Sequence, residues 1–235
     1  MRSPMHQWLM ASTLLGGLAT VNAQSRPAVV ELFTSEGCSS CPPAEAYVGE
    51  LAHRGDVLAL AFHVDYWDGL GWRDRFELAN AAQRQRGYAK SLRLSSVYTP
   101  QVIVDGHRDF VGSDRVAIGK ALAARRSAIA VALSLRSGEV LVTVGAKEGG
   151  PPSDVVLVAY LRSAVTPIGR GENAGRTIKE YNVVREFRQL GRWDGTDRRY
   201  RWPVKSLPRD ATDVAVLIQA VGQGAIIGDA KVALR

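Results

Sequence analysis

The stretch Glu31-Leu-Phe-Thr-Ser-Glu-Gly-Cys-Ser-Ser-Cys-Pro-Pro-Ala-Glu45 contains both cysteines of the chain, Cys38 and Cys41. The apolar residues 29–33 are typical of a buried strand. After Cys41, apolar residues recur at helical spacing up to residue 52, which predicts a helix that begins near the second cysteine. Ser39 or Ser40 is expected to cap this helix, and the two prolines after Cys41 suit its first turn.

The position of the cysteines at the start of a helix favours a reactive pair. The first N–H groups of a helix have no partner within the helix, and they carry a partial positive charge. This charge is expected to lower the pKa of the Cys38 thiol below its usual value. Cys41 is expected to be less exposed and to attack the mixed disulfide that Cys38 forms with a substrate.

The N-terminus has the pattern of a secretory signal peptide over residues 1–23. Arg2 precedes an apolar run, and Val21-Asn22-Ala23 forms a small-residue cleavage site. The run is too short for a membrane span, and no later segment has eighteen apolar residues in a row. The sequence therefore predicts a periplasmic or secreted protein that does not span a membrane.

Length and composition indicate a globular protein. The chain has 235 residues, of which 46% are hydrophobic, so it can form one large domain or two ordinary ones. Its formal net charge of +7 is spread along the sequence, and Arg125-Arg126 and Arg198-Arg199 are its only adjacent arginines. Scattered charge favours a solvated surface, so nucleic acid is not an expected partner.

Three interpretations of the cysteine pair remain open. A disulfide across four residues closes very little chain and stabilises little by loop entropy, which favours redox chemistry. The second interpretation is an inert disulfide in a protein that only recruits partners. The third is a Cu(I) site formed by Cys38 and Cys41, with His63 as a further ligand. No other metal and no cofactor is expected.

A second apolar run at residues 56–64 predicts a central strand, which with the first strand and helix makes a βαβ unit. Ligands of such folds bind at the carboxyl edge of the sheet, where Cys38 is expected to lie. His63, Asp65 and Trp67 follow at the same edge. His63 is interpreted as a proton shuttle or a core histidine, and Asp65 and Trp67 as a substrate-binding wall or as packing residues.

The remaining pattern divides the chain into two parts. Residues 73–94 read as one helix or two, residues 96–112 as a hairpin that follows a proline, and residues after Ser113 as a helix capped by that serine. Beyond about residue 128, short alternating segments predict antiparallel strands. The expected domains are an α/β unit over 24–128 and an antiparallel β-sandwich over 129–235.

The order β-α-β-α-β-β-α, with Cys-x-x-Cys at the first helix and Thr99-Pro100 before the third strand, resembles thioredoxin. The resemblance implies a thioredoxin-like N-terminal domain in which Pro100 is cis and the backbone of Thr99 pairs with the substrate chain. It places Tyr98, the residue before Thr99, in the substrate-binding surface. It also implies a buried acid on the first strand, for which Glu31 is the nearest match.

Three segments narrow the resemblance: the opening stretch, Phe-His-Val-Asp-Tyr-Trp-Asp at 62–68, and Val-Tyr-Thr-Pro-Gln at 97–101. They are similar to a family of secreted bacterial thioredoxin-like proteins catalogued as a domain of unknown function. The implied activity is disulfide exchange with protein thiols, with a membrane or soluble redox partner that regenerates the cysteines.

The glycine-flanked segment 171–176 also belongs to this resemblance. We interpret it as a loop that joins two strands, or as a cover over the cysteines that brings Arg176 to the Cys38 thiolate.

Overall fold

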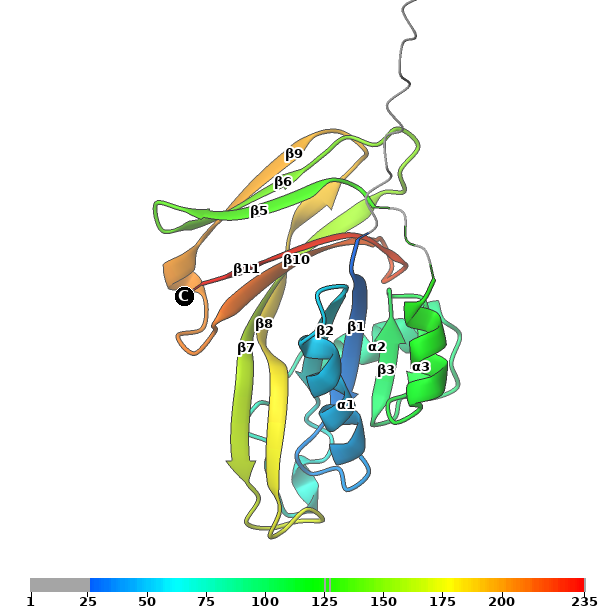
Figure 1. Cartoon of the computed structure of the whole chain (residues 1–235), viewed down its shortest axis with the longest axis vertical. Helices are drawn as coiled ribbons and strands as arrows, with labels where there is room; N and C mark the ends of the chain where they lie inside the picture. The colour runs from blue at the N-terminus through cyan, green and yellow to red at the C-terminus, as the bar shows by residue number, and fades with distance from the viewer. Residues whose placement is uncertain (1–25, 125, 127, 235) are drawn as a thin grey trace, which may run out of the picture.

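A computed structural model describes residues 26–124, 126 and 128–234. The predicted signal peptide at 1–23 lies outside this range. Within the described residues the chain forms a large mixed sheet and a smaller antiparallel sheet, with the α-helices grouped before residue 123 (Figure 1). The fold is therefore mixed α/β.

The opening stretch forms the expected strand and helix. Strands β1 (Ala28–Thr34) and β2 (Val57–His63) are parallel neighbours, joined by α1 (Pro42–Ala52). Every residue of both strands is buried, which agrees with their continuous apolar sequence. Pro42 and Pro43 occupy the first helical turn as predicted, but Cys41 is the N-cap and no side chain caps the helix. The prediction of a serine cap is wrong because Ser40 and Ser39 lie one and two residues before the N-cap position.

The large sheet joins strands from both halves of the sequence. Its order is β11 (Ile226–Ala233), β10 (Asp213–Ala220), β7 (Ser153–Pro167), β8 (Thr177–Trp193), β2, β1, β3 (Gln101–Val104) and β4 (Arg108–Val111). The junction is parallel pairing of β2 and β8 at Ala61 and Val183. The alternating segments after residue 128 are strands as predicted, but four of them extend the first sheet. Alternation reports which side of a strand is buried, not which strand lies beside it.

The smaller sheet contains β5 (Val131–Arg136), β6 (Glu139–Val144) and β9 (Arg198–Pro203), followed by the short helix η2 (Val204–Ser206). It packs across the β7 and β10 part of the large sheet (Figure 1). Trp193 is fully buried in this layer, among aliphatic side chains from both sheets. The smaller antiparallel sheet thus packs on strands of the large mixed sheet, and the two share one core.

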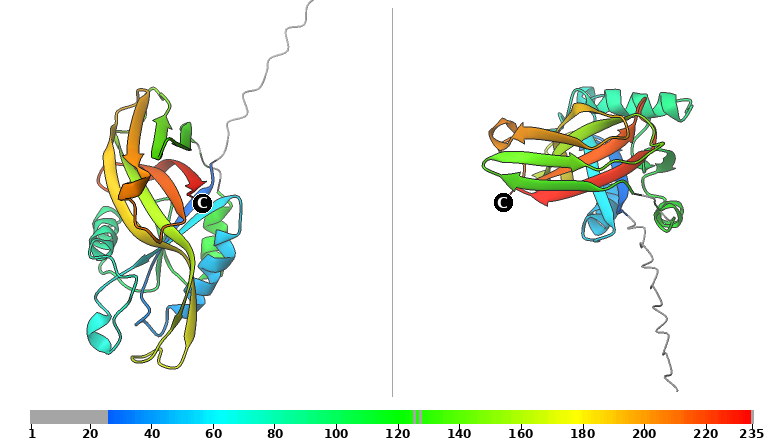
Figure 2. Two further views of the ribbon diagram at one scale, coloured as in Figure 1. Left: turned by 90° about the vertical axis from the view of Figure 1, so that its left-hand side faces the viewer. Right: turned by 90° about the horizontal axis from the view of Figure 1, so that it is seen from above.

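The helices cover both faces of the β1–β2–β3 region (Figure 2). Helices α1 and α3 (Arg115–Leu122) pack on one face, and α2 (Ala81–Ser91) packs on the other. The predicted helical region 73–94 is helical only in α2, and it is preceded by the short helix η1 (Asp68–Leu70) and an irregular segment. The cap of α3 is Asp114, whose carboxylate accepts the N–H of Ala117, and not Ser113.

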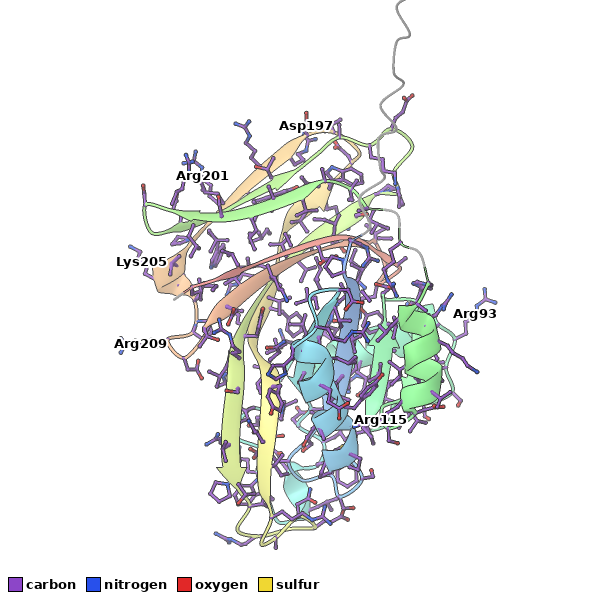
Figure 3. The ribbon with its side chains drawn as sticks, in the orientation of Figure 1. Arg93, Arg115, Asp197, Arg201, Lys205 and Arg209 are labelled. Atoms are coloured by element: carbon purple, nitrogen blue, oxygen red, sulfur yellow. A yellow bond between two sulfur atoms is a disulfide. The ribbon has the colours of Figure 1, made fainter. Side chains whose placement is uncertain are left out.

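Charged side chains project from many elements of the surface, for example Arg115 on α3, Arg201 on β9 and Lys205 on η2 (Figure 3). Among the described residues, none of the helices combines the length and the apolar character that a bilayer span requires.

Candidate functional site

Cys38 and Cys41 form a disulfide at the point where the chain passes from β1 into α1. Their Cα atoms are 5.4 Å apart, and the N–H of Cys41 donates to the carbonyl of Cys38 at 3.2 Å. Both residues have 0% exposure. The prediction that Cys38 is the more exposed of the two is therefore wrong in this structure, and the reason lies in a distant part of the chain.

The turn between β7 and β8, residues 168–176, covers the disulfide loop. The side-chain amide of Asn173 donates to the carbonyls of Glu36 at 2.9 Å and Cys38 at 3.0 Å, and it is 1% exposed. The N–H of Ser39 donates to Glu172 at 3.3 Å. Arg176 binds the side-chain oxygen of Asn173 at 3.2 Å. The segment is thus both a strand connection and a cover, and Arg176 acts on Asn173.

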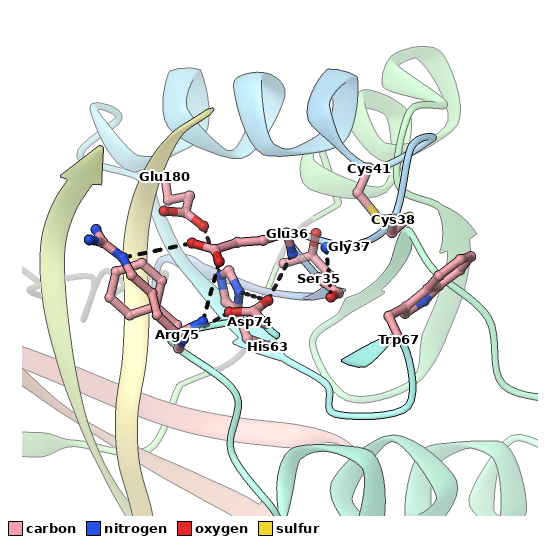
Figure 4. A network of polar contacts seen from close by, with 12 residues as sticks. Ser35, Glu36, Gly37, Cys38, Cys41, His63, Trp67, Asp74, Arg75 and Glu180 are labelled. Atoms are coloured by element: carbon pink, nitrogen blue, oxygen red, sulfur yellow. Dashed lines mark hydrogen bonds and ion pairs between the residues drawn. A yellow bond between two sulfur atoms is a disulfide. The ribbon is translucent and has the colours of Figure 1, made fainter. Parts of the chain in front are cut away.

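Trp67 and Thr99 lie on the other side of the disulfide loop. A Cβ on Gly37 would come within 3.2 Å of the Trp67 Cβ, so this glycine allows Trp67 to approach the turn before Cys38 (Figure 4). The Trp67 indole N–H donates to the Thr99 hydroxyl at 2.8 Å. The peptide bond between Thr99 and Pro100 is cis, as the sequence resemblance implied. The structure therefore brings Cys38, Trp67 and Thr99 together.

Tyr98 and Asp65 occupy more peripheral positions. The Tyr98 hydroxyl donates to Asp109 on β4, and its carbonyl accepts the side-chain amide of Gln85 on α2. These bonds fix the loop that carries Thr99. Asp65 is exposed in the turn after β2, where its carbonyl accepts the N–H of Asp68.

Glu31 lies on the face of β1 that α2 covers. Side chains alternate along a strand, so Glu31 shares a face with Val29 and Phe33, which pack in the same cluster as Tyr88 of α2. Its carboxylate binds the Arg84 guanidinium at 2.7 Å and the Tyr88 hydroxyl. Helix α1 packs on the opposite face. This environment gives Glu31 a structural role between β1 and α2.

A cluster of buried ionisable side chains lies beside the disulfide loop, on the side away from Trp67 (Figure 4). His63 Nδ1 is 2.7 Å from the Asp74 carboxylate, and His63 Nε2 is 3.8 Å from Glu180. The same Asp74 oxygen accepts the backbone N–H of Glu36 at 2.8 Å. The fifth member, Glu45, accepts the Thr34 hydroxyl at 2.7 Å. We call Glu36, Glu45, His63, Asp74 and Glu180 the acid–base cluster.

The acid–base cluster holds protons near neutral pH. Burial raises the pKa of Glu45 to about 7, although His63 and the Thr34 hydroxyl lower it. Burial likewise raises the pKa of Glu180 to about 8, against the opposing charge of His63. Burial of His63 disfavours its charged form, but Asp74, Glu180 and Glu45 outweigh this and raise its pKa to about 9. The imidazolium in turn lowers the pKa of Asp74 against the effect of burial.

His63, which the sequence suggested as a Cu(I) ligand, is surrounded by carboxylates of the acid–base cluster. Its Nδ1 is bonded to Asp74 and its Nε2 faces Glu180. Among the described residues, no group of three or more histidine, cysteine or acidic side chains has the arrangement of a metal site. Both ring nitrogens of His63 thus face carboxylates of the cluster.

A family model described as "Protein of unknown function (DUF1223)" matches residues 29–219. The chain belongs to the DUF1223 family. The match extends from β1 through most of β10, so it includes the disulfide, its cover and the acid–base cluster.

Two solved structures are similar to this DUF1223 chain. A crystal structure of an Agrobacterium tumefaciens protein is 30% identical, with a TM-score of 0.78 over 89% of this chain and 95% of that one. HBP35 of Porphyromonas gingivalis is 16% identical, with a TM-score of 0.61 over 89% of this chain and 76% of that one, which is a likeness of fold. No curated protein matches.

Sequence reasoning missed four members of the acid–base cluster of this DUF1223 chain: Glu36, Glu45, Asp74 and Glu180. Glu45 had a signal, because it lies four residues after Cys41 in a predicted helix and so on the same side of it. Asp74 and Glu180 had none, because one lies in the irregular segment before α2 and the other on β8. Nothing in their local sequence reports that they are buried.

The acid–base cluster predicts that the protein loses stability as the pH rises from about 5 to about 9. The folded-state pKa of His63 lies above its unfolded value, so its contribution is complete below about 6.5 and is lost as the pH rises through about 9. The raised pKa values of Glu45 and Glu180 act in the same direction, with losses up to about 7 and 8. Asp74 contributes above its unfolded pKa and loses this only in stronger acid.

We expect the free energy of unfolding to fall by at least about 1.4 kcal/mol over this range, the equivalent of one pKa unit. Urea titrations at several pH values measure it. Glu180→Gln removes one raised carboxyl group, so its profile is expected to be flatter. A stability that is constant or rises towards pH 9 contradicts the assignment.

Proposed function

We propose that the protein is a thiol–disulfide oxidoreductase of thioredoxin-like type, which exchanges disulfides with protein thiols through Cys38 and Cys41. The observation that carries this proposal is the disulfide itself, which closes a ring of four residues and ends at the N-cap of α1. Such a short ring adds little stability by restricting the unfolded chain, whereas a helix N-terminus stabilises a thiolate.

Neighbouring features support this chemistry. The elements up to α3 follow the order β-α-β-α-β-β-α, apart from η1, and the Cys-x-x-Cys precedes the first helix. Trp67 and Thr99 form a wall beside Cys38, where the backbone of Thr99 is suited to pair with a substrate chain. The acid–base cluster lies behind the turn and can exchange protons, which every round of disulfide reduction requires.

The proposed cycle starts with a substrate thiolate that attacks Cys38 and displaces Cys41 as a thiolate. A second substrate thiol then attacks the mixed disulfide and releases reduced Cys38. The substrate dithiol becomes a disulfide and the protein disulfide becomes two thiols, so two electrons and two protons are transferred. The reverse sequence starts from reduced protein, with Cys38 as the nucleophile. The signal-like residues 1–23 support a periplasmic or secreted location, where a membrane or soluble redox partner would regenerate the pair.

The reduction potential of the cysteine pair tests this function. The protein is equilibrated in glutathione buffers, free thiols are trapped, and Cys38→Ala serves as the control that cannot form the disulfide. A potential above about −200 mV indicates an oxidant or isomerase, and one near −270 mV a reductant. We expect a reduction potential above about −300 mV, which either kind of redox-active pair would show. A pair that stays oxidised below about −300 mV is a structural bond, and the proposal then fails.

A further inference from the structure

Glu45 lies one helical turn after Cys41 on α1, at the edge of a groove that opens to solvent. The N–H of Glu45 donates to the carbonyl of Cys41 at 3.1 Å, so the two residues are one helical turn apart on the same side of α1. Glu45 is 4% exposed, yet it also lines a groove of about 400 Å³ between α1 and β8. Arg176, Lys179 and Tyr181 form the β8 side of this groove.

Within the acid–base cluster, four polar atoms are buried and have no hydrogen-bond partner among the described residues. They are Glu36 Oε1, Glu45 Oε2, His63 Nε2 and Glu180 Oε1. In Glu45 the other oxygen, Oε1, accepts the Thr34 hydroxyl. Its Oε2 is therefore left to take or give a proton. An unsatisfied buried carboxylate oxygen costs about 1–3 kcal/mol or more, so its retention calls for a reason other than stability.

From this geometry we propose that Glu45 carries the proton of Cys41 to and from the groove between α1 and β8, while His63 sets the charge of the cluster. This inference rests on the proposed function, because it assigns the proton step of that exchange. Glu45 faces groups from each element packed around it: Thr34 of β1, Glu36 of the disulfide loop, His63 of β2, Asp74 of the segment before α2, and Glu180 of β8. The groove is also lined by Glu50 of α1, His53 at the C-cap of α1, Lys179 of β8 and Arg176 of the turn before β8.

When the substrate thiolate bonds to Cys38, the bond between Cys38 and Cys41 breaks and its electron pair stays on Cys41. Glu45 gives this thiolate its proton and regains one through the groove. In the reverse direction, Cys41 gives its proton to Glu45 as its sulfur attacks the mixed disulfide at Cys38. The substrate sulfur leaves with the electron pair of the broken bond.

The pKa of Glu45, about 7, suits both directions. At neutral pH the carboxyl group is present in comparable amounts of its acidic and basic forms, the condition under which a proton donor and acceptor is most effective. An exposed glutamate would be almost fully ionised and could not donate. The burial that leaves Glu45 Oε2 without a partner is thus the same property that makes the residue useful here.

The test is the rate at which Cys41 resolves a mixed disulfide, measured from about pH 5.5 to 9. Reduced protein is mixed with excess glutathione disulfide, and acid-quenched samples are analysed by mass. In the unaltered protein we expect the resolution rate to rise through an inflection near pH 7. In Glu45→Gln the inflection disappears, and the rate at pH 7 falls at least about tenfold, since general-base contributions are commonly 100-fold or more.

Two further variants separate this role from a structural one. Glu50→Gln changes an exposed glutamate that lines the same groove, and its profile is expected to match that of the unaltered protein. Thr34→Val removes a hydrogen bond that lowers the pKa of Glu45, so its inflection should move to higher pH. A merely structural Glu45 would change the melting temperature and leave the inflection in place.

The outcomes also separate this inference from the proposed function. If the unaltered protein forms no mixed disulfide that Cys41 resolves, the oxidoreductase proposal itself fails. If the unaltered protein resolves it and Glu45→Gln keeps both the rate and the inflection, only the assignment of Glu45 is overturned. Thr34→Val decides the matter if Glu45→Gln does not fold, because an unmoved inflection in that variant contradicts the assignment as well.

Discussion

Replacement of Arg84 by methionine is expected to lower the free energy of unfolding by about 3–5 kcal/mol, the range found when one partner of a buried ion pair is removed. Arg84 binds Glu31 at 2.7 Å and Gln219 at 3.1 Å, and Glu31 is 0% exposed. Without the guanidinium, the Glu31 carboxylate is left in the core with only the Tyr88 hydroxyl. The substitution also loosens α2 from β10, because Gln219 lies on β10.

Urea unfolding measures this change in the free energy of unfolding, and two further variants serve as comparisons. The double variant Glu31→Leu, Arg84→Met is expected to recover most of the loss, because apolar side chains of similar size replace a buried pair without a stranded charge. Arg54→Met breaks an exposed pair with Asp56 and should cost less than about 1 kcal/mol. If the double variant also exchanges disulfides at the unaltered rate, Glu31 has no part in the chemistry. A slower rate would restore the role that the resemblance to thioredoxin assigned to it.

Glu31 also illustrates how far sequence reasoning reaches. The strand, the helix and their order could be predicted because apolar spacing, the two prolines and the βαβ rules are local signals. The same signals placed His63 and Trp67 at the edge of the sheet beside Cys38, and the structure puts both near the disulfide (Figure 4). The role of Glu31 depends on which helix covers its face of β1. In the structure that helix is α2, and α1 with the cysteines lies on the opposite face.

The cover of the disulfide shows what local sequence does not report. Asn173 is separated from Cys38 by 135 residues, and the contact exists because β8 joins the sheet beside β2. Strand pairing between distant segments is set by the total packing of the sheet, and a single sequence holds no local record of it. For the same reason, the prediction of a separate sandwich over 129–235 did not foresee that β8 pairs with β2. The sequence left two interpretations of segment 171–176, a connection between strands and a cover over the cysteines. Once the pairing of β7, β8 and β2 is known, the segment is seen to be both.

Replacement of Asn173 by alanine is expected to make the disulfide react about 10- to 50-fold faster with dithiothreitol. The two hydrogen bonds from its amide to the carbonyls of Glu36 and Cys38 hold the β7–β8 turn against the disulfide loop, and both cysteines are fully buried in this closed form. At about 1 kcal/mol for each bond, their loss raises the population of the open form roughly 30-fold. Asn173→Asp should act at least as strongly, since a carboxylate cannot donate to the two carbonyls.

The reduction rate under native conditions measures this effect, and its urea dependence shows what opens. Movement of the turn alone exposes little surface, so the rate should depend only weakly on urea, whereas global unfolding would give a slope close to that of equilibrium unfolding. Gln189→Ala is the matched control, because this amide bonds Asp154 at the far end of the same hairpin. An Asn173→Ala variant that reacts no faster than this control would mean that thiols reach Cys38 without displacement of the turn. The disulfide would then be approached from the side of Trp67 and Thr99, and the cover would serve stability alone.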